Sequence, residues 1–289
     1  MKIRKLSGTI LVGLLMAGGA AAVYAALTPA APTPVAAAAP VVAPVAAVTP
    51  PPPPVSPEEK AKIESVLHDY IIKNPEVIVE ALQAMQQKQM DEAKKTIEKT
   101  HQLAPKFADQ LFHNAGNPVI GNPKGAVSLV EFFDYQCPHC VNMQPIIEAL
   151  IKANPDLRVV YVEFPIRGKA SETATRIALA AQIQGKYYPY YGAMMKLKQL
   201  PITEAMIFAS AKTAGLDIDK AKLDMNNKQI SDQIAQNTKL GQDLQLLGTP
   251  ALFIAKTDVK NGAPADSISF IPGQADQEQL QQIINKYKH

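Results

Sequence analysis

The sequence predicts an α/β domain that is preceded by a helical N-terminal region. Two apolar segments, 126–133 and 157–166, have the composition of buried strands, and a helical pattern lies between them. A long helical stretch then covers 169–241, before two further strand segments and a closing helix. Strands that alternate with helices are typical of α/β folds, and the length suits one such domain plus an appendage.

The first 25 residues have the composition of a secretory signal peptide. Their basic start (Lys2, Arg4, Lys5) precedes a short apolar run, 10–16, and Val23-Tyr24-Ala25 is a plausible cleavage site. An uncleaved membrane anchor is the alternative, but the apolar run is short and glycines interrupt it. We therefore expect export to the periplasm or cell envelope, where disulfide bonds persist.

Cleavage would remove three basic residues and no acidic ones, so the formal charge would fall from +3 to zero. That balance gives no reason to expect nucleic acid or anionic lipid as a partner. The next segment, 26–55, is rich in Ala and Pro and holds ten of the 24 prolines of the chain. Because such a segment has little apolar surface to bury, we expect an extended linker.

Two amphipathic helices are predicted next, in a region that we assign to 56–113. Ser56 and Pro57 suit the start of the first helix, and Asn74-Pro75 the start of the second. A polar stretch, 86–99, extends the second helix. Both helices carry apolar residues at helical spacing: Ile63, Val66, Leu67, Tyr70, Ile71, Ile78, Leu82 and Met85.

These helices could pack on the main domain, but the polar stretch would hold them away from it. Two helices of this size also cannot enclose a core by themselves. We therefore favour self-association, as a homodimer or a trimer.

The globular domain is predicted to occupy 114–289. Its first central strand, 126–133, is apolar from Ser128 onward except for Glu131, and it runs directly into Cys137-Pro138-His139-Cys140. The remaining elements are a helix over 141–153, a strand over 157–166, the helical segments of 169–241, strands within 247–255 and 266–273, and a helix over 274–287.

Cys137 and Cys140 are the only cysteines of the chain. A zinc site would need two more ligands, and the remaining histidines lie in helical, linker or terminal segments. Haem attachment would need a histidine directly after the second cysteine, where the chain has Val141. The sequence therefore favours neither a metal site nor a cofactor.

A redox dithiol needs only the residues that are present. At the start of a helix, residues three apart lie on one face, so the two sulfur atoms can bond. The free amides of the helix start stabilise a thiolate at Cys137. Pro138 costs no hydrogen bond there, His139 can add a donor or a positive charge, and Cys140 would be the more buried thiol.

From Asn117 to Lys288 the chain resembles the DsbA-like disulfide oxidoreductases of the bacterial envelope. The resemblance rests on the motif VEFFDYQCPHC, on the helical insertion over about 169–241, and on Gly-Thr-Pro before a strand. It implies a thioredoxin fold with a helical insertion. It further implies that Cys137 is the attacking thiolate and Cys140 the resolving thiol, and that no cofactor is required.

The same resemblance implies roles for two further residues. Glu131 matches a buried acid that moves protons for the dithiol, and a salt-bridged structural carboxylate is the alternative. Pro250 matches a cis-proline that faces the cysteines and presents its backbone to the substrate. The residue before it, Thr249, is common in the isomerases and reductases of the family, whereas the strong oxidases have Val.

The N-terminal helical region resembles the dimerisation segments of envelope isomerases and of extended relatives such as the Com1-type surface proteins. We therefore expect an enzyme that forms and isomerises disulfides in secreted proteins. Unfolded or wrongly bonded secreted proteins would be its substrates, and a membrane protein of the DsbB or DsbD type its redox partner. The alternatives are a dedicated oxidase with a spacer appendage, and a surface interaction or chaperone-like protein whose thiols are incidental.

Overall fold

The computed structural model describes residues 55–197 and 199–288. The predicted signal peptide and nearly all of the predicted linker lie outside these residues. The chain divides into two structural units at Glu64, inside helix α1 (Pro57–Lys73). Among the described residues, no helix is long and apolar enough to cross a membrane.

Helix α1 begins at a capping box. The Ser56 hydroxyl accepts the backbone N–H of Glu59 at 3.3 Å, and the Glu59 carboxylate accepts the Ser56 N–H and O–H at 2.9 and 2.8 Å. Asn74 does not help to start the next helix as predicted. Its side-chain amide donates to the carbonyl of Tyr70 at 2.8 Å and so closes α1, while α2 (Glu76–Leu103) begins without a side-chain cap.

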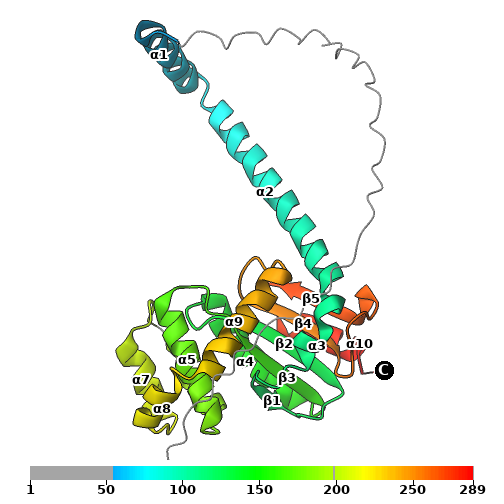
Figure 1. Ribbon diagram of the computed structural model, residues 1–289. Coiled ribbons are helices and arrows are strands. Elements are labelled where there is room, and N and C mark those ends of the chain that lie inside the picture. The colour runs from blue at the N-terminus through cyan, green and yellow to red at the C-terminus, as the bar shows by residue number, and fades with distance from the viewer. Residues whose placement is uncertain (1–54, 198, 289) are drawn as a thin grey trace, which may run out of the picture. The chain divides into compact units, whose positions relative to one another are not determined.

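A five-stranded mixed sheet forms the centre of the globular domain (Figure 1). Its strands lie in the spatial order β1 (Val119–Gly121), β3 (Leu157–Glu163), β2 (Val127–Phe133), β4 (Ala251–Lys256) and β5 (Ile268–Pro272). Strands β2 and β3 run parallel, and the other neighbouring pairs run antiparallel. The sequence did not predict β1, because three residues at a sheet edge are too few to show an alternating pattern.

The central strand β2 is buried along its whole length, as predicted. Its Glu131 is in register with Tyr161 of β3 on one side and with Leu252 of β4 on the other. Because side chains at paired positions of neighbouring strands point to the same side, Glu131 and Tyr161 share one face of the sheet.

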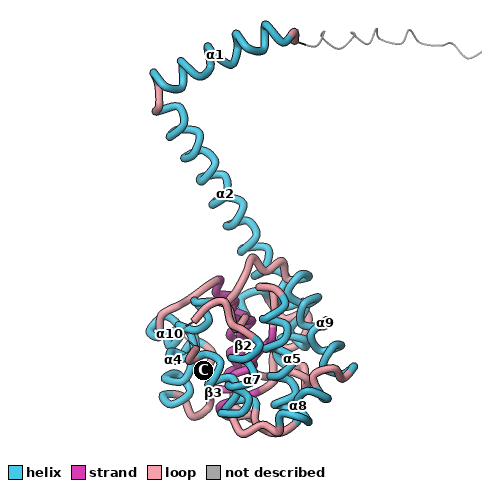
Figure 2. Tube along the Cα trace, turned by 90° about the vertical axis from the view of Figure 1, so that its left-hand side faces the viewer, coloured by secondary structure: helices cyan, strands magenta, loops and turns pink. Residues whose placement is uncertain are grey.

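Helices cover both faces of the sheet (Figure 2). One face packs against α4 (Pro138–Ala153), α10 (Gln277–Lys286) and most of the insertion, and the other against the short helices η1 (Ala104–Phe107) and α3 (Ala108–Phe112). The insertion consists of α5 (Lys169–Ile183), α6 (Tyr187–Met195), α7 (Glu204–Thr213), α8 (Ile218–Asp224) and α9 (Lys228–Asp243).

The globular core begins earlier in the chain than the sequence analysis placed it. Ala104, Ala108, Leu111 and Phe112 are fully buried against the sheet, although 56–113 was assigned to the helical region. The last turns of α2 also reach this core, where the Thr100 hydroxyl donates to the Leu244 carbonyl at 2.9 Å. The polar stretch of α2 is therefore exposed in its first part, while the C-terminal end of the helix packs on the globular domain.

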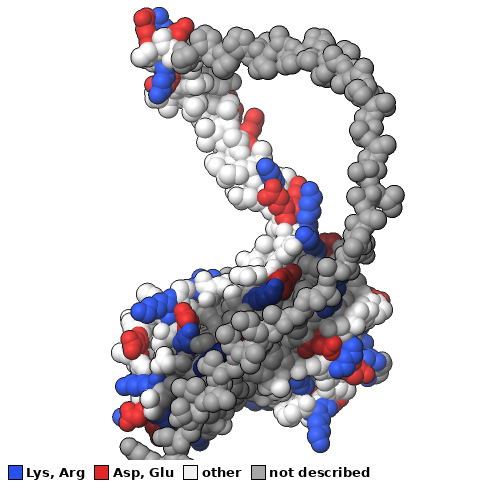
Figure 3. All heavy atoms as spheres, viewed as in Figure 1, with Lys and Arg blue, Asp and Glu red and all other residues white. Residues whose placement is uncertain are grey.

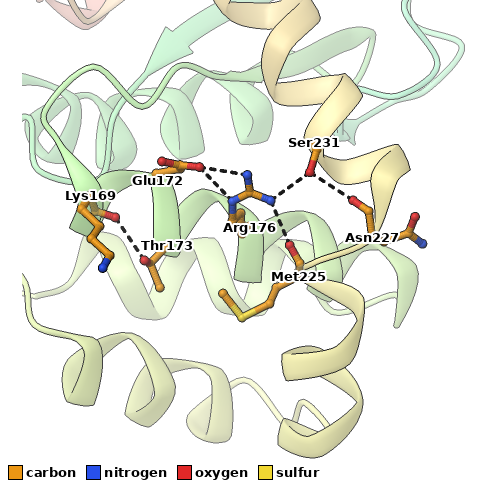
Figure 4. A network of polar contacts seen from close by, with 7 residues as sticks. All are labelled: Lys169, Glu172, Thr173, Arg176, Met225, Asn227 and Ser231. Carbon is orange, nitrogen blue, oxygen red and sulfur yellow. Dashed lines mark hydrogen bonds and ion pairs between the residues drawn. The ribbon is translucent and has the colours of Figure 1, made fainter.

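Arg176 of α5 fastens the insertion together (Figure 4). Its guanidinium pairs with Glu172 at 2.9 Å and donates to the Met225 carbonyl and the Ser231 hydroxyl, each at 3.1 Å. These contacts join α5 to α9 and to the connection that precedes it. They fix α5 to α9 within the insertion, which packs on the same face of the sheet as α4.

Candidate active site

Asp134 fixes the turn between β2 and α4, and the sequence analysis did not single it out. One carboxylate oxygen accepts the Gln136 N–H and the Ser171 hydroxyl, both at 2.7 Å. The other accepts the N–H groups of Ile166 and Arg167 at 2.9 and 3.0 Å. The buried carboxylate therefore joins the loop after β2 to the loop after β3, and it sets the position of the cysteine that follows.

Cys137 caps α4 with an extended backbone (φ −91°, ψ 113°), and Pro138 is the first helical residue. Cys140 lies one turn into the helix, and its N–H donates to the Cys137 carbonyl at 3.0 Å. Both thiols are free, and both residues have 0 % of their surface exposed. The structure thus brings the two cysteines together at the helix start.

The pKa of Cys137 is lowered to about 5. The largest cause is a hydrogen bond from the Cys140 thiol. Burial opposes it, while Thr249 and the backbone N–H groups of Cys140 and His139 lower the pKa further. A thiol with this pKa is ionised at neutral pH, and it is also a good leaving group.

The pKa of the Cys140 thiol is shifted in the opposite direction. Burial raises its pKa well above the usual range of a thiol, and the hydrogen bond to Cys137 and the negative charge of Glu131 raise it further. Cys140 therefore keeps its proton while Cys137 gives its proton up. One nucleophilic and one protonated thiol lie side by side.

The loop before β4 faces the cysteines. The Thr249–Pro250 peptide bond is cis, the conformation that the family resemblance implies. The Cys137 sulfur lies 3.1 Å from the Thr249 carbonyl oxygen, to which the thiol donates when it is protonated. The buried Thr249 side chain interacts with the ionised form and lowers the pKa of Cys137. A cavity of about 280 Å³ adjoins this loop, and Ile97 and Thr100 of α2 form part of its wall.

The two residues between the cysteines are exposed. The ring of His139 turns towards Gln274, with Nδ1 at 3.1 Å from the side-chain oxygen. His139 acts on the Cys137 sulfur through its backbone N–H rather than through its ring. The donor expected at His139 is thus a main-chain group.

Glu131 lies fully buried behind the dithiol. Neither carboxylate oxygen has a hydrogen-bond partner among the described residues, and no cation described in the structure pairs with it. Burial raises the pKa of Glu131 well above its usual range, and the charge of Cys137 raises it further. The structure therefore gives no support to the salt-bridged alternative.

A second buried acid, Glu163, was missed by the sequence analysis. Its carboxylate accepts the hydroxyls of Tyr135, Tyr187 and Thr175 at 2.9, 2.9 and 2.8 Å. Burial raises the pKa of Glu163 to about 8, although the three hydrogen bonds act in the opposite direction. The signal was present in the sequence, since Glu163 is a lone acid in an apolar strand, as Glu131 is.

Within the part of the chain that the structure describes, no group of three or more His, Cys, Asp and Glu side chains is placed to hold a metal ion. The groups that the structure brings together at this site are the two thiols, the two buried acids and the cis-proline loop.

The model of the DSBA-like thioredoxin domain family matches residues 128–285. The chain belongs to this family. Its thioredoxin fold with a helical insertion is confirmed, and its activity is that of a disulfide oxidoreductase. A second family model, the N-terminal domain of copper resistance protein ScsC, matches residues 59–92.

Individual relatives agree with this assignment. The thiol:disulfide interchange protein DsbA of Yersinia pestis is 31 % identical over 55 % of this chain and 79 % of its own length. A thioredoxin-like oxidoreductase from Silicibacter pomeroyi is 36 % identical over 62 % of this chain and 95 % of its own, with a TM-score of 0.56. BcfH of Salmonella enterica Typhimurium is 28 % identical over 80 % and 97 %, with a TM-score of 0.58.

Proposed function

We propose that the protein forms and isomerises disulfides in secreted proteins through the Cys137–Cys140 dithiol. The observation that carries this proposal is the opposite ionisation of the two thiols. The pKa of Cys137 is lowered to about 5, whereas the pKa of Cys140 is raised. Such a pair has a nucleophile that is ready at neutral pH and a second thiol that is held in reserve.

Oxidation begins when a substrate thiolate attacks Cys137 in the enzyme disulfide and Cys140 leaves. A second substrate thiolate then attacks the substrate sulfur of the mixed disulfide, and Cys137 leaves as a thiolate. The substrate loses two electrons and the dithiol gains them. In isomerisation, reduced Cys137 attacks a wrong disulfide and later leaves, so no net oxidation occurs.

The Thr249–Pro250 loop is the proposed substrate-binding edge. Its carbonyl at Thr249 lies 3.1 Å from the Cys137 sulfur, so an extended chain that pairs with this loop would bring a cysteine to the nucleophile. Both cysteines are covered in the free protein, so we expect the substrate to displace the loop slightly as it binds.

Cysteine substitutions test the assigned roles. Cys140→Ala should accumulate mixed disulfides with client proteins, because the attacking thiolate remains and the resolving thiol is lost. Cys137→Ala is the matched control and should trap none. Clients that accumulate on Cys137→Ala instead would show that the attacker and the resolver are assigned the wrong way round.

The N-terminal helices support self-association as a homodimer or trimer. α1 has no buried residue, and apolar side chains remain open on both helices, with Val66 68 %, Leu67 53 % and Leu82 49 % exposed. Few charged side chains interrupt the first half of α2 (Figure 3). Apolar stripes of this kind are stable in water when a second copy covers them.

Charge substitutions in the full chain test the assembly. Leu67→Glu combined with Leu82→Glu should give a monomer that still oxidises dithiols but loses most isomerase activity. Ser65→Glu combined with Gln83→Glu places the same charges at exposed polar positions and is the control. Light scattering and the refolding of scrambled ribonuclease measure the two properties. A monomer with full isomerase activity would break the proposed link.

We place the protein in the periplasm or cell envelope, with unfolded or wrongly bonded secreted proteins as substrates. A membrane redox partner of the DsbB or DsbD type would reset the dithiol. Alkylation trapping in intact cells tests the balance of activities: a mostly oxidised dithiol indicates an oxidase, and a mostly reduced one an isomerase or reductase.

A further inference from the structure

Three polar side chains lie fully buried behind the dithiol. The two carboxylate oxygens of Glu131 have no hydrogen-bond partner among the described residues, while the hydroxyls of Tyr161 and Tyr191 interact with each other and have no further described partner. All three residues have 0 % exposed surface. Because buried polar groups are nearly always hydrogen-bonded to protein or to ordered water, this arrangement indicates an internal water site.

The geometry joins these groups to one another. Glu131 and Tyr161 are register partners on β2 and β3, and the rings of Tyr161 and Tyr191 stack with centroids 4.4 Å apart. The charge of Glu131 contributes to the raised pKa of Cys140 on α4, of Tyr161 on β3 and of Tyr191 on α6. Glu131 is thus electrostatically coupled to the thiol on one side and to the two tyrosines on the other.

A third tyrosine, Tyr188, links the buried pair to the surface of the domain. The ring of Tyr188 stacks on that of Tyr191 at 6.3 Å, and its hydroxyl donates to the Glu148 carboxylate at 2.8 Å. Tyr188 is 38 % exposed and Glu148 is half-buried. The charges of Tyr188 and Glu148 also raise the pKa of Tyr161, so Tyr161 is electrostatically coupled to both the buried acid and the half-buried one.

We propose that Tyr161 and Tyr191, with ordered water bound between them and Glu131, form the proton path that connects Cys140 to Glu148 and solvent. This inference rests on the proposed dithiol exchange. Glu148 is then the proton acceptor at the surface, and Tyr161 and Tyr191 are positioning residues that hold the water between Glu131 and Glu148.

The proton balance follows from the exchange steps. When a substrate thiolate attacks Cys137, the disulfide breaks and Cys140 leaves as a thiolate. Cys140 takes a proton from Glu131, and the path replaces that proton from solvent. When the disulfide re-forms from a mixed disulfide, Cys140 gives its proton to Glu131 and attacks the Cys137 sulfur, the bond from Cys137 to the partner sulfur breaks, and the partner leaves as a thiolate. The proton then leaves by the same route.

The test removes the two hydroxyls and keeps the rings. Tyr161→Phe combined with Tyr191→Phe should slow the single-turnover reaction of the oxidised protein with dithiothreitol by about tenfold, since a positioned proton relay contributes at least that much. The solvent isotope effect should rise, because proton delivery becomes rate-limiting. The pKa of Cys137, followed by thiolate absorbance, should stay unchanged.

Tyr190→Phe is the matched control. Its ring belongs to the same buried cluster, but its hydroxyl donates to the Ala174 carbonyl at 3.1 Å and has no place in the path. Glu148→Gln, at a partly exposed position, removes the outer acceptor without disturbing the core, so it tests the path even if the double variant fails to fold.

Rates of the double variant and of Glu148→Gln that equal those of Tyr190→Phe would overturn the path, although wild-type exchange would still support the proposed function. A loss of rate accompanied by a shift in the pKa of Cys137 would also overturn it, because the tyrosines would then act on the thiolate. A wild-type protein without any exchange would instead refute the proposed function, and the path with it.

Discussion

Two regions of the sheet bury a carboxyl group, and they do so in different ways. Glu163, at the end of β3, accepts hydrogen bonds from three hydroxyls. Glu131, in the middle of β2, has no such partner among the described residues and lies near the ionised sulfur of Cys137. Both side chains are fully buried, and burial raises the pKa of each.

We propose that the difference separates a structural acid, Glu163, from a chemical one, Glu131. A buried polar group that is fully hydrogen-bonded can hold neighbouring elements in place, whereas one without partners costs stability. The Glu163 network joins β3 to the turn at Tyr135, to α5 and to α6. Glu131 joins no elements in this way, and the charge that raises its pKa is that of Cys137. The cost of burying it is understandable if it transfers protons.

The largest effect should come from Glu163→Ala. It would leave three buried hydroxyls without their acceptor, and a penalty of about 1 kcal/mol for each gives a loss of about 3 kcal/mol in the free energy of unfolding. Urea denaturation measures the loss. Glu163→Gln retains one acceptor oxygen and should lose less. Equal, small losses in both variants would remove the distinction between the two acids.

Glu131→Gln should show the opposite profile. The free energy of unfolding should stay the same or rise, because an unpartnered ionisable group is replaced by a neutral one. Dithiol exchange should slow by about tenfold or more, because the proton of Cys140 loses its acceptor. Stopped-flow exchange rates and urea denaturation on the same sample measure both. Unchanged exchange across neutral pH would make Glu131 a structural residue.

The pH dependence of stability sharpens the comparison. The pKa of Glu163 is raised to about 8 in the folded protein, against about 4.3 in an unfolded chain, so the folded state binds more protons between these values. Its contribution is therefore complete below about pH 4 and is lost as the pH rises through 8. The raised pKa of Glu131 acts in the same direction.

Thermal unfolding from pH 5 to 9 measures this dependence. The oxidised protein should be used, because the lowered pKa of Cys137 in the reduced protein has the opposite sign: its contribution is lost as the pH falls through 5. Stability of the oxidised protein should fall across the range, and Glu163→Gln should flatten the curve. An unchanged slope in that variant would contradict the raised pKa.

Much of this site could be predicted from the sequence. Cys137 and Cys140 stand out as the only cysteines, and the lone acid at Glu131 interrupts an apolar strand. The strands of the core and the helical insertion follow from hydrophobic periodicity. The cis peptide at Pro250 could be expected only from the family resemblance, because isolated X-Pro bonds are mostly trans.

Other parts depend on contacts between distant segments. The roles of Asp134 and Glu163 come from partners 32 to 37 and 12 to 28 positions away. The tyrosine cluster joins β2, β3 and α6, which are separate in the sequence. No local pattern reports such contacts. The end of α2 shows the same limit, since its polar composition hides the anchoring of Thr100 on the Leu244 carbonyl.

The smallest predicted effect tests a single donor of the Glu163 network. Thr175→Val replaces the hydroxyl that donates to Glu163 at 2.8 Å with a methyl group of similar size. The loss of one buried hydrogen bond should lower the free energy of unfolding by about 1 kcal/mol. The pKa of Glu163 should rise further, because that bond stabilises the carboxylate.

Thr173→Val is the control, since Thr173 lies on the same helix and its exposed hydroxyl bonds only to the Lys169 carbonyl. Both substitutions have similar helix propensity costs, so the difference between them isolates the bond to Glu163. Equal unfolding free energies for the two variants would show that Glu163 does not depend on this donor, and the contrast with Glu131 would then rest on Tyr135 and Tyr187 alone.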